Sequence, residues 1–113
     1  MVNVFISHSR KDKELIRAID DIFRSVDVTP LFMEFTPESK PPYKKIEENV
    51  TKSNAVFLFL TENVISSEYT KNWISFEGGL AKKANKELFV VEDVNNRIHF
   101  PVPYVTDYIL YEP

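Results

Sequence analysis

The chain has 113 residues, of which 43% are hydrophobic, and nine Phe give it enough apolar material for the core of one domain, expected to cover 1–113. Its net charge of -3 and isoelectric point near 5.4 argue against a nucleic-acid partner, because phosphate binding needs clustered Lys and Arg in excess. The absence of Cys excludes disulfides, thiolate nucleophiles and zinc-thiolate sites.

The first part of the chain predicts two strands with a helix between them. Residues 2–6 form a nearly continuous apolar run, typical of a buried parallel strand, and Ser7–Ser9 follow it as a loop. Apolar residues at helical spacing then predict a helix over 15–26. A second strand is predicted over 28–32, where Pro30 favours an edge position because it cannot donate to a neighbouring strand.

The middle of the chain opens with a long loop. The Met33–Pro42 segment holds three Pro and is predicted to be exposed and irregular. A short amphipathic helix is expected over Tyr43–Ser53, and Ala55–Leu60 is the strongest candidate for a buried strand. A loop is expected at Thr61–Asn63, before the next helix.

The last part of the chain predicts one further helix and two strands. The helix is expected over Tyr69–Lys86 and the strands over 88–91 and 108–111. Strands that alternate with helices predict an α/β domain, here a flavodoxin-like open parallel five-stranded sheet with helices on both faces. In such sheets ligands bind at the carboxyl ends of the strands.

No segment of the sequence is a candidate for membrane insertion or secretion. The longest apolar run, 55–60, is far too short to span a bilayer, and Met1 leads directly into a strand pattern without a charged leader. We therefore expect a soluble, cytoplasmic protein without a membrane partner.

The Ser7–Ser9 segment offers two hydroxyls and an imidazole where α/β sheets contact ligands. Two interpretations stay open: the segment contacts a ligand, or Ser9 caps the following helix and His8 is a surface polar residue. A hydrolase triad is not favoured, because the chain contains no Gly-x-Ser-x-Gly motif.

Glu77 is the acid whose local sequence is hardest to explain by solvation. In a helix, the residues that face it are three and four positions away, namely Trp73, Ile74, Leu80 and Ala81. None of them can pair with a charge, so we expect a partly desolvated carboxyl with a raised pKa. Gly78 and Gly79 each cost about 1 kcal/mol of helix propensity relative to Ala, and we expect them to clear space beside the acid.

Trp73 and Glu77 lie four residues apart and therefore point the same way from a helix. The spacing lets a flat ring stack on the indole while the carboxylate reaches an attached sugar. It fits equally well with Trp73 in the core and Glu77 at its edge. Spacing alone leaves both interpretations open.

The sequence lacks the residues that several other kinds of functional site require. The acidic pairs of the helices have no further ligand at metal-binding spacing, so we expect no metal site. No glycine-rich phosphate loop is present, which argues against a redox dinucleotide cofactor or a P-loop nucleotide. Thr61 stands at the end of the third strand, where a phosphoacceptor receiver domain needs a carboxylate.

These residues in this order resemble a Toll/interleukin-1 receptor (TIR) domain of the prokaryotic enzymatic type. The matching features are Val4-Phe5-Ile6-Ser7-His8-Ser9, the variable Met33–Pro42 loop, and Trp73-x-x-x-Glu77 followed by Gly79 and Ala81. The resemblance covers nearly the whole chain.

The resemblance implies cleavage of NAD+ between nicotinamide and ribose, with Glu77 as the catalytic carboxylate. By the same mapping the substrate-binding residues are Trp73, Phe5, Ser7, His8 and Tyr43. NAD+ is then a substrate and not a redox cofactor. One carboxylate suffices, because nicotinamide leaves a pyridinium as a neutral base and needs no proton. The implied products are nicotinamide with ADP-ribose or a cyclic isomer, and the implied setting is antiviral defence signalling.

The resemblance also implies self-association through the Met33–Pro42 loop. The chain lacks the usual Gly near Pro41-Pro42 and the usual Pro after its fourth strand. We expect the final helix of the family to be short or absent in the given residues, or to lie beyond them. Two alternative functions stay open: a non-enzymatic adaptor that binds other TIR domains, and an enzyme like the nucleoside deoxyribosyltransferases, which also place a glutamate at a ribose carbon.

Overall fold

The computed structural model describes residues 2–9, 11–35, 43–65, 68–97, 102 and 105–112. Within these ranges the side chains of 34, 35, 43, 65 and 68–75 lie outside the described part. In chain order the elements are β1 (Val2–Ser9), α1 (Lys13–Ser25), β2 (Val28–Phe35), α2 (Tyr43–Thr51), β3 (Ala55–Phe59), α3 (Glu62–Ile65), α4 (Glu68–Lys83), β4 (Glu87–Asp93) and β5 (Asp107–Tyr111).

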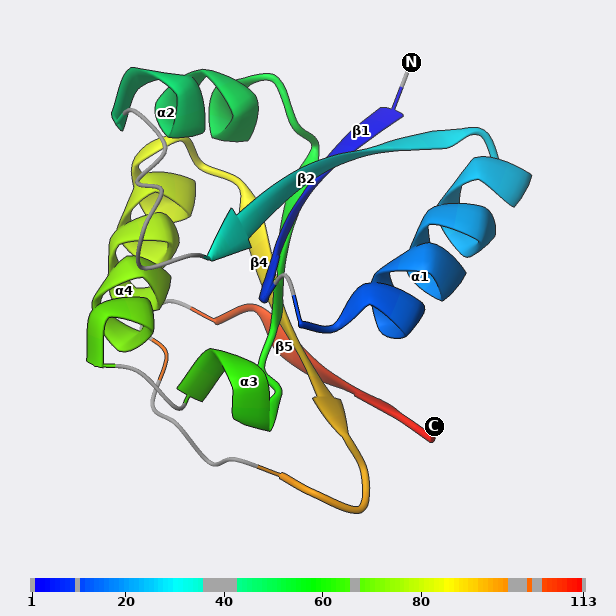
Figure 1. Ribbon diagram of the computed structural model, residues 1–113. Helices are drawn as coiled ribbons and strands as arrows, with labels where there is room; N and C mark the ends of the chain where they lie inside the picture. The colour runs from blue at the N-terminus through cyan, green and yellow to red at the C-terminus, as the bar shows by residue number, and fades with distance from the viewer. Residues whose placement is uncertain are drawn as a thin grey trace.

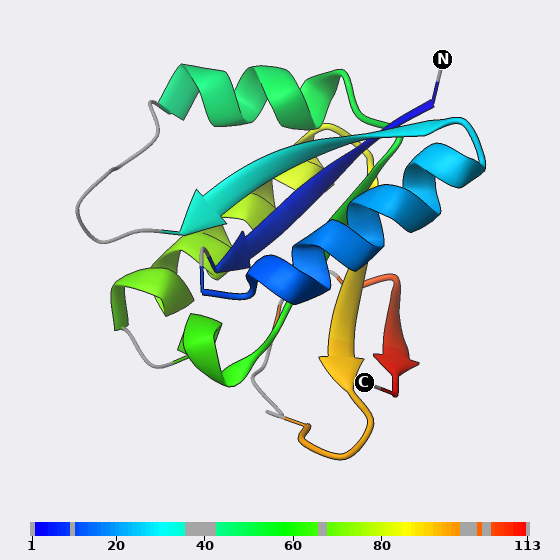
Figure 2. The same ribbon diagram turned by 45° about the vertical axis from the view of Figure 1, so that its right-hand side comes forward.

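The five strands form one parallel sheet in the order β2-β1-β3-β4-β5. Helix α1 lies on one face of this sheet, and α2, α3 and α4 lie on the other (Figures 1 and 2). The expected α/β architecture, a five-stranded parallel sheet with helices on both faces, is confirmed. Strand β2 is added on one side of β1, and β3, β4 and β5 are added on the other side. Sheets of this type bind ligands at the point between β1 and β3 where the order of strands changes in this way.

Strand alternation divides the core into two layers. On the α2 and α4 side, Phe5, Leu58 and Val90 from the strands pack with residues of these helices. On the α1 side, Val4, Ile6 and Phe59 meet the half-buried apolar residues of α1. Successive residues of β1 therefore point to opposite faces of the sheet.

Strand β1 is longer than expected, because Ser7–Ser9 belong to the strand and not to a loop. Ser7 pairs with Met33, and Ser9 pairs with Phe35, so β2 also continues beyond the predicted end at Phe32. Backbone pairing between the two strands continues past the point where the side chains become polar. The expected edge position of Pro30 is confirmed, since β2 is the first strand of the sheet.

The helices differ from the predictions in their ends and in one additional turn. Asp12, not Ser9, is the N-cap of α1, and the Ser9 hydroxyl accepts the backbone N–H of Lys11 instead. The single turn α3 stands where a loop was expected. Helix α4 ends at Lys83, because Asn85 takes a left-handed conformation with φ 58° and reverses the chain.

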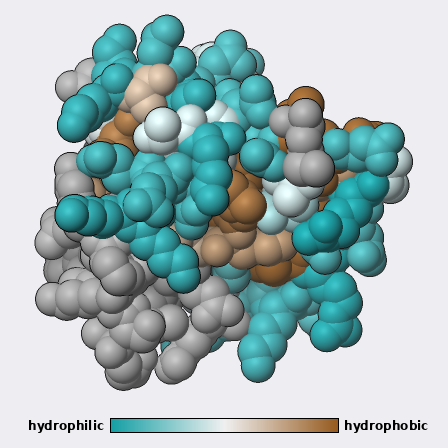
Figure 3. Space-filling model, turned by 90° about the horizontal axis from the view of Figure 1, so that it is seen from above, coloured by the Kyte–Doolittle hydropathy of each residue, from teal (hydrophilic) through white to brown (hydrophobic). Residues whose placement is uncertain are grey.

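Strand β5 forms the second edge of the sheet, and most of its residues are exposed. Seen from above relative to Figure 1, the described surface is largely hydrophilic. Hydrophobic residues come to the surface in the middle of the view and on its right-hand side, where α1 lies (Figure 3). No helix among the described residues is long and apolar enough to cross a membrane.

Candidate active site

The centre of the candidate site is a hydrogen bond between Ser7 and Glu77. The Ser7 hydroxyl donates to Glu77 Oε1 at 2.9 Å, and both side chains are fully buried. The second carboxylate oxygen, Oε2, has no hydrogen-bond partner among the described residues. The contact joins β1 to α4, on the face of the sheet that α2 and α4 cover.

The surroundings of Glu77 hold its carboxyl group in the protonated form. Burial raises the pKa of Glu77 from its ordinary value of 4.5 to about 8, and the hydrogen bond from Ser7 works in the opposite direction. No cation among the described residues forms an ion pair with it. The expectation of a desolvated acid with a raised pKa is therefore confirmed, and its one hydrogen bond within the described part of the chain comes from a neutral hydroxyl.

Three of the other predicted substrate contacts lie on the same elements or the same face as this pair. Phe5 shares the Ser7 face of β1 and is buried in the core. Trp73 stands one helical turn before Glu77 in α4, and Tyr43 is the first residue of α2. The side chains of Trp73 and Tyr43 lie outside the described residues, so their contacts with substrate stay a prediction.

His8 points away from this pair. It follows Ser7 in β1, so its side chain faces the α1 side of the sheet, where its ring meets Phe32 edge to face at 5.6 Å. The side chain is only 3% exposed, so the interpretation of His8 as a surface residue is wrong. It borders a small cavity of about 320 Å³ together with Lys13 and Arg17 of α1. The structure therefore separates the imidazole from the Glu77 carboxyl by the thickness of the sheet.

Sequence reasoning missed a second buried carboxylate, Glu92. It is fully buried near the end of β4, and Arg97 forms an ion pair with it at 3.5 Å. Alternation along β4 places Glu92 on the same face as Leu88 and Val90, which is also the face of Glu77. The signal was present in the sequence, since Glu92 continues the every-second-residue apolar row of that strand.

The two glycines after Glu77 have different positions. Gly79 lies two residues beyond Glu77, on the opposite side of α4, and an added Cβ there meets no atom of the described residues within 4 Å. The expectation that Gly79 clears space beside the acid is therefore wrong. Gly78 is buried, and its role stays a prediction.

A comparison with protein families matches residues 4–101 to the model described as TIR domain. The chain belongs to the TIR domain family. The match includes both Ser7 and Glu77, and the order of strands in the sheet agrees with the expected flavodoxin-like fold. A comparison with curated protein sequences finds no match for this TIR domain.

Three solved structures share the fold of this TIR domain. A CMP N-glycosidase from Clostridium botulinum has a TM-score of 0.59 and 15% identity, covering 98% of this chain and 90% of that chain. A 3-dehydroquinate dehydratase-like protein from Bifidobacterium longum has a TM-score of 0.55 and 11% identity over 97% of this chain and 84% of that chain. The glutaminase domain of Trypanosoma brucei CTPS with bound acivicin has a TM-score of 0.52 and 10% identity over 80% of this chain, which spans only 36% of that chain. At these identities the likeness extends to the fold alone.

The Met33–Pro42 loop, expected to mediate self-association, is described only at its first three residues, which continue β2. Residues 36–42 lie outside the described part of the chain. No cluster of three or more His, Asp or Glu side chains suited to a metal ion occurs among the described residues.

Proposed function

We propose that this TIR domain cleaves NAD+ at the bond between nicotinamide and ribose, with Glu77 as the catalytic carboxylate. The observation that carries the proposal is the full burial of Glu77 with a neutral hydroxyl as its hydrogen-bond partner. A structural acid at such depth would normally be paired with a cation. Chemically perturbed carboxyls of this kind concentrate at functional sites.

The cationic leaving group explains how a neutral Glu77 becomes active. The pyridinium of NAD+ carries a positive charge, and an opposite charge within a few ångströms favours the ionised form of a carboxyl group. Substrate binding is therefore expected to release the Glu77 proton to solvent. The carboxylate then stabilises the oxocarbenium-like centre at the ribose carbon, in a site where low dielectric strengthens the interaction.

The reaction balances with water as the second reactant. The bond between the ribose carbon and the pyridinium nitrogen breaks, and its electron pair stays on nicotinamide, which leaves neutral. A water oxygen bonds to the ribose carbon and loses a proton to solvent, which gives ADP-ribose. If an adenine nitrogen or a ribose hydroxyl reaches that carbon first, the product is a cyclic isomer. Trp73 and Tyr43 are proposed to contact the substrate rings, with Phe5 as the remaining proposed contact. His8, predicted from the sequence as a further contact, is left out because its side chain lies on the opposite face of the sheet.

Chromatography of the products tests this proposal. Concentrated protein is incubated with NAD+, and released nicotinamide is quantified for the wild type, Glu77→Gln and Glu48→Gln. Glu48 is exposed on α2, so its variant is the matched control. We expect Glu77→Gln to lower turnover by roughly 100-fold or more and Glu48→Gln to leave it unchanged. Equal turnover of the wild type and Glu77→Gln would exclude the proposal.

The same assay separates the two alternatives. CMP and a deoxynucleoside with a free acceptor base are offered beside NAD+, because one fold neighbour is named as a CMP N-glycosidase. Base release or exchange with NAD+ untouched would favour a nucleosidase or deoxyribosyltransferase activity. Assembly with other TIR domains that persists in Glu77→Gln, without turnover of any nucleotide, would favour an adaptor. We also propose that this TIR domain self-associates through residues 33–42, is located in the cytoplasm and acts in antiviral defence.

A further inference from the structure

His8 is the predicted contact residue that the proposed reaction leaves unused, and it has a different setting on the α1 face. Its side chain borders a cavity of about 320 Å³ between α1, the end of β1 and β2. The sheet lines this cavity with His8, Ser9 and Phe32, and α1 lines it with Lys13, Ile16, Arg17 and Asp20. The cavity is separate from the candidate active site, since Ser7 and Glu77 meet on the α2 and α4 side.

Positive charge exceeds negative charge around this cavity. Lys13 and Arg17 stand one helical turn apart on the same side of α1, and neither forms an ion pair with another described residue. Like charges at this spacing repel each other, and an anion between them removes the repulsion. Asp20 is the acid of the lining, and its carboxylate already accepts a hydrogen bond from Arg24 at 2.7 Å. The two cations are therefore placed to hold an anion from outside the chain.

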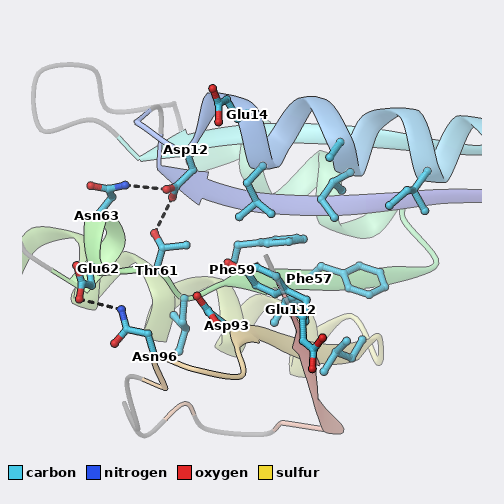
Figure 4. A pocket seen from close by; sticks show the side chains of 18 of the residues that line it. Asp12, Glu14, Phe57, Phe59, Thr61, Glu62, Asn63, Asp93, Asn96 and Glu112 are labelled. Atoms are coloured by element: carbon cyan, nitrogen blue, oxygen red, sulfur yellow. Dashed lines mark hydrogen bonds between the residues drawn. The ribbon is translucent and has the colours of Figure 1, made fainter.

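The first turn of α1 adds hydrogen-bond donors beside Lys13. Asp12 is the N-cap residue, but its side chain accepts no hydrogen bond from α1 itself. Figure 4 shows its carboxylate turned toward Thr61 and Asn63, which donate to it at 2.6 and 2.7 Å. The backbone N–H groups of the first turn are thus left uncapped by Asp12, and the positive end of the helix dipole favours an anion there. Glu14, the acid of this turn, does not line the cavity.

The imidazole of His8 is held in one orientation at the wall of the cavity. The side chain is 3% exposed, and Nδ1 lies 3.0 Å from the carbonyl oxygen of Ser9. Because a carbonyl oxygen only accepts, this contact places a hydrogen on Nδ1. Phe32 meets the ring edge to face at 5.6 Å. A protonated imidazole also donates from Nε2, so His8 joins an ammonium and a guanidinium around one space.

We propose that this cavity binds a phosphate group, taken either from inorganic phosphate or from a small phosphate monoester. Arg17 offers two parallel N–H donors that match two phosphate oxygens, Lys13 supplies a second charge, and His8 bounds the buried side. At about 320 Å³ the cavity lies at the small end of ligand sites, so it fits a phosphate with a small organic group better than a dinucleotide. The proposal does not involve Glu77 and goes beyond NAD+ cleavage.

The test titrates the 113-residue chain at neutral pH and low salt with inorganic phosphate, glycerol 3-phosphate and glycerol. Amide and histidine-ring chemical shifts are followed by NMR. The chain has two His, and a His99→Gln variant assigns the signal of His8. We expect both phosphates to bind with a Kd of about 1 mM or tighter and glycerol not to bind, with shifts centred on the His8 ring and residues 13–17. The phosphate that binds more tightly identifies the source.

Matched substitutions then assign the binding to the cavity. Lys13→Gln and Arg17→Gln are each expected to weaken phosphate binding by roughly tenfold. Lys11→Gln is the control, because Lys11 is exposed near the start of α1, carries the same charge and does not line the cavity. Asp20→Asn should tighten binding several-fold, because it removes the acid of the lining, and Asp21→Asn, exposed outside the cavity, should not. Unchanged amide shifts elsewhere verify that each variant is folded.

Four results would overturn the proposal. The first is absence of binding of either phosphate by the wild type at tens of millimolar. The second is equal weakening by Lys11→Gln and Lys13→Gln, which would reduce the effect to overall charge. The third is a set of shifts centred on Glu77, which would place the phosphate in the candidate active site. The fourth is binding by Glu34→Gln alone, which would assign the cations to Glu34, the residue beside His8 in the strand register. All four are measured without NAD+.

Discussion

Ser7 in β1 and Glu77 in α4 stand 70 residues apart in the chain, and a buried hydrogen bond of 2.9 Å joins them. The hydroxyl is a donor to an acid that burial keeps protonated, so it holds the carboxyl group in one orientation without supplying a charge. The second oxygen of Glu77 has no hydrogen-bond partner within the described ranges, and the ionisation of the group is sensitive to a cation that enters the site.

The raised pKa of Glu77 predicts that the protein loses stability as the pH rises. The unfolded chain releases this proton near pH 4.5 and the folded protein near pH 8, so the folded state binds more protons in between. The free energy of unfolding should therefore fall through this window, by up to about 1.4 kcal/mol per pH unit from this group. Urea unfolding at pH 5, 6, 7 and 8 measures the slope. In Glu77→Gln this contribution should vanish, and in Glu48→Gln it should persist; identical slopes in all three proteins would contradict the assignment.

Removal of the Ser7 hydroxyl is expected to change the pH dependence of NAD+ cleavage. The hydrogen bond lowers the pKa of Glu77, so Ser7→Ala should raise it and move the acid limb of kcat/KM to higher pH. A hydrogen bond contributes about 1 kcal/mol, which corresponds to a shift of about 0.7 pH unit.

Ser9→Ala is the control for this change. Ser9 lies on the same face of β1, and its hydroxyl accepts the backbone N–H of Lys11. The pH profile of Ser9→Ala should match the wild type. If both variants lose activity uniformly across the pH range, the Ser7 hydroxyl does not act through Glu77.

Gly79→Ala is expected to stabilise the protein without loss of turnover. Gly79 lies inside α4 with a φ outside the left-handed region, and its added Cβ meets no described atom within 4 Å. Ala exceeds Gly in helix propensity by about 1 kcal/mol, so the free energy of unfolding should increase by about 0.5 to 1 kcal/mol. Thermal and urea unfolding measure the gain, and nicotinamide release measures turnover. A loss of turnover at unchanged stability would instead indicate that Gly79 contributes to the substrate site.

The ion pair between Glu92 and Arg97 is expected to contribute to folding. Arg97 is one-third exposed, at 33%, and its guanidinium also lies over the ring of Tyr108 at 5.4 Å. Arg97→Ala should cost about 1 to 3 kcal/mol, because it removes a cation that pairs with a buried carboxylate. A double-mutant cycle with Glu92→Gln isolates the pair from the packing of the arginine stem. If the free-energy changes of the two single substitutions add up to that of the double variant, the two side chains do not interact in solution.

Periodicity in the chain was sufficient to predict most of the fold. The apolar stripe over 15–26 and the apolar run over 55–60 depend on neighbours two to four residues away, which the sequence displays directly. The edge position of Pro30 follows from a missing backbone donor, which is again a local property. The desolvation of Glu77 was predictable for the same reason, since its neighbours on one helix face are apolar.

Contacts between residues far apart in the sequence decided where β1 ends and which way its polar side chains point. The sequence suggested that β1 stops where its side chains become polar, but pairing with β2 carries the strand through Ser9. That extension turns Ser7 toward Glu77 and His8 toward α1, because successive residues of a strand point to opposite faces.

Local patterns in this TIR domain thus determine which segments become helix or strand and which acid lacks a local partner. Only the folded chain decides that Ser7 supplies the missing donor, that Glu92 is buried, and that a cavity forms between His8 and α1 on the far face. The physical reason is that strand pairing and side-chain burial join residues 49 to 70 positions apart, from Asp12 with Thr61 to Ser7 with Glu77. Spacing along the sequence carries no information at that range.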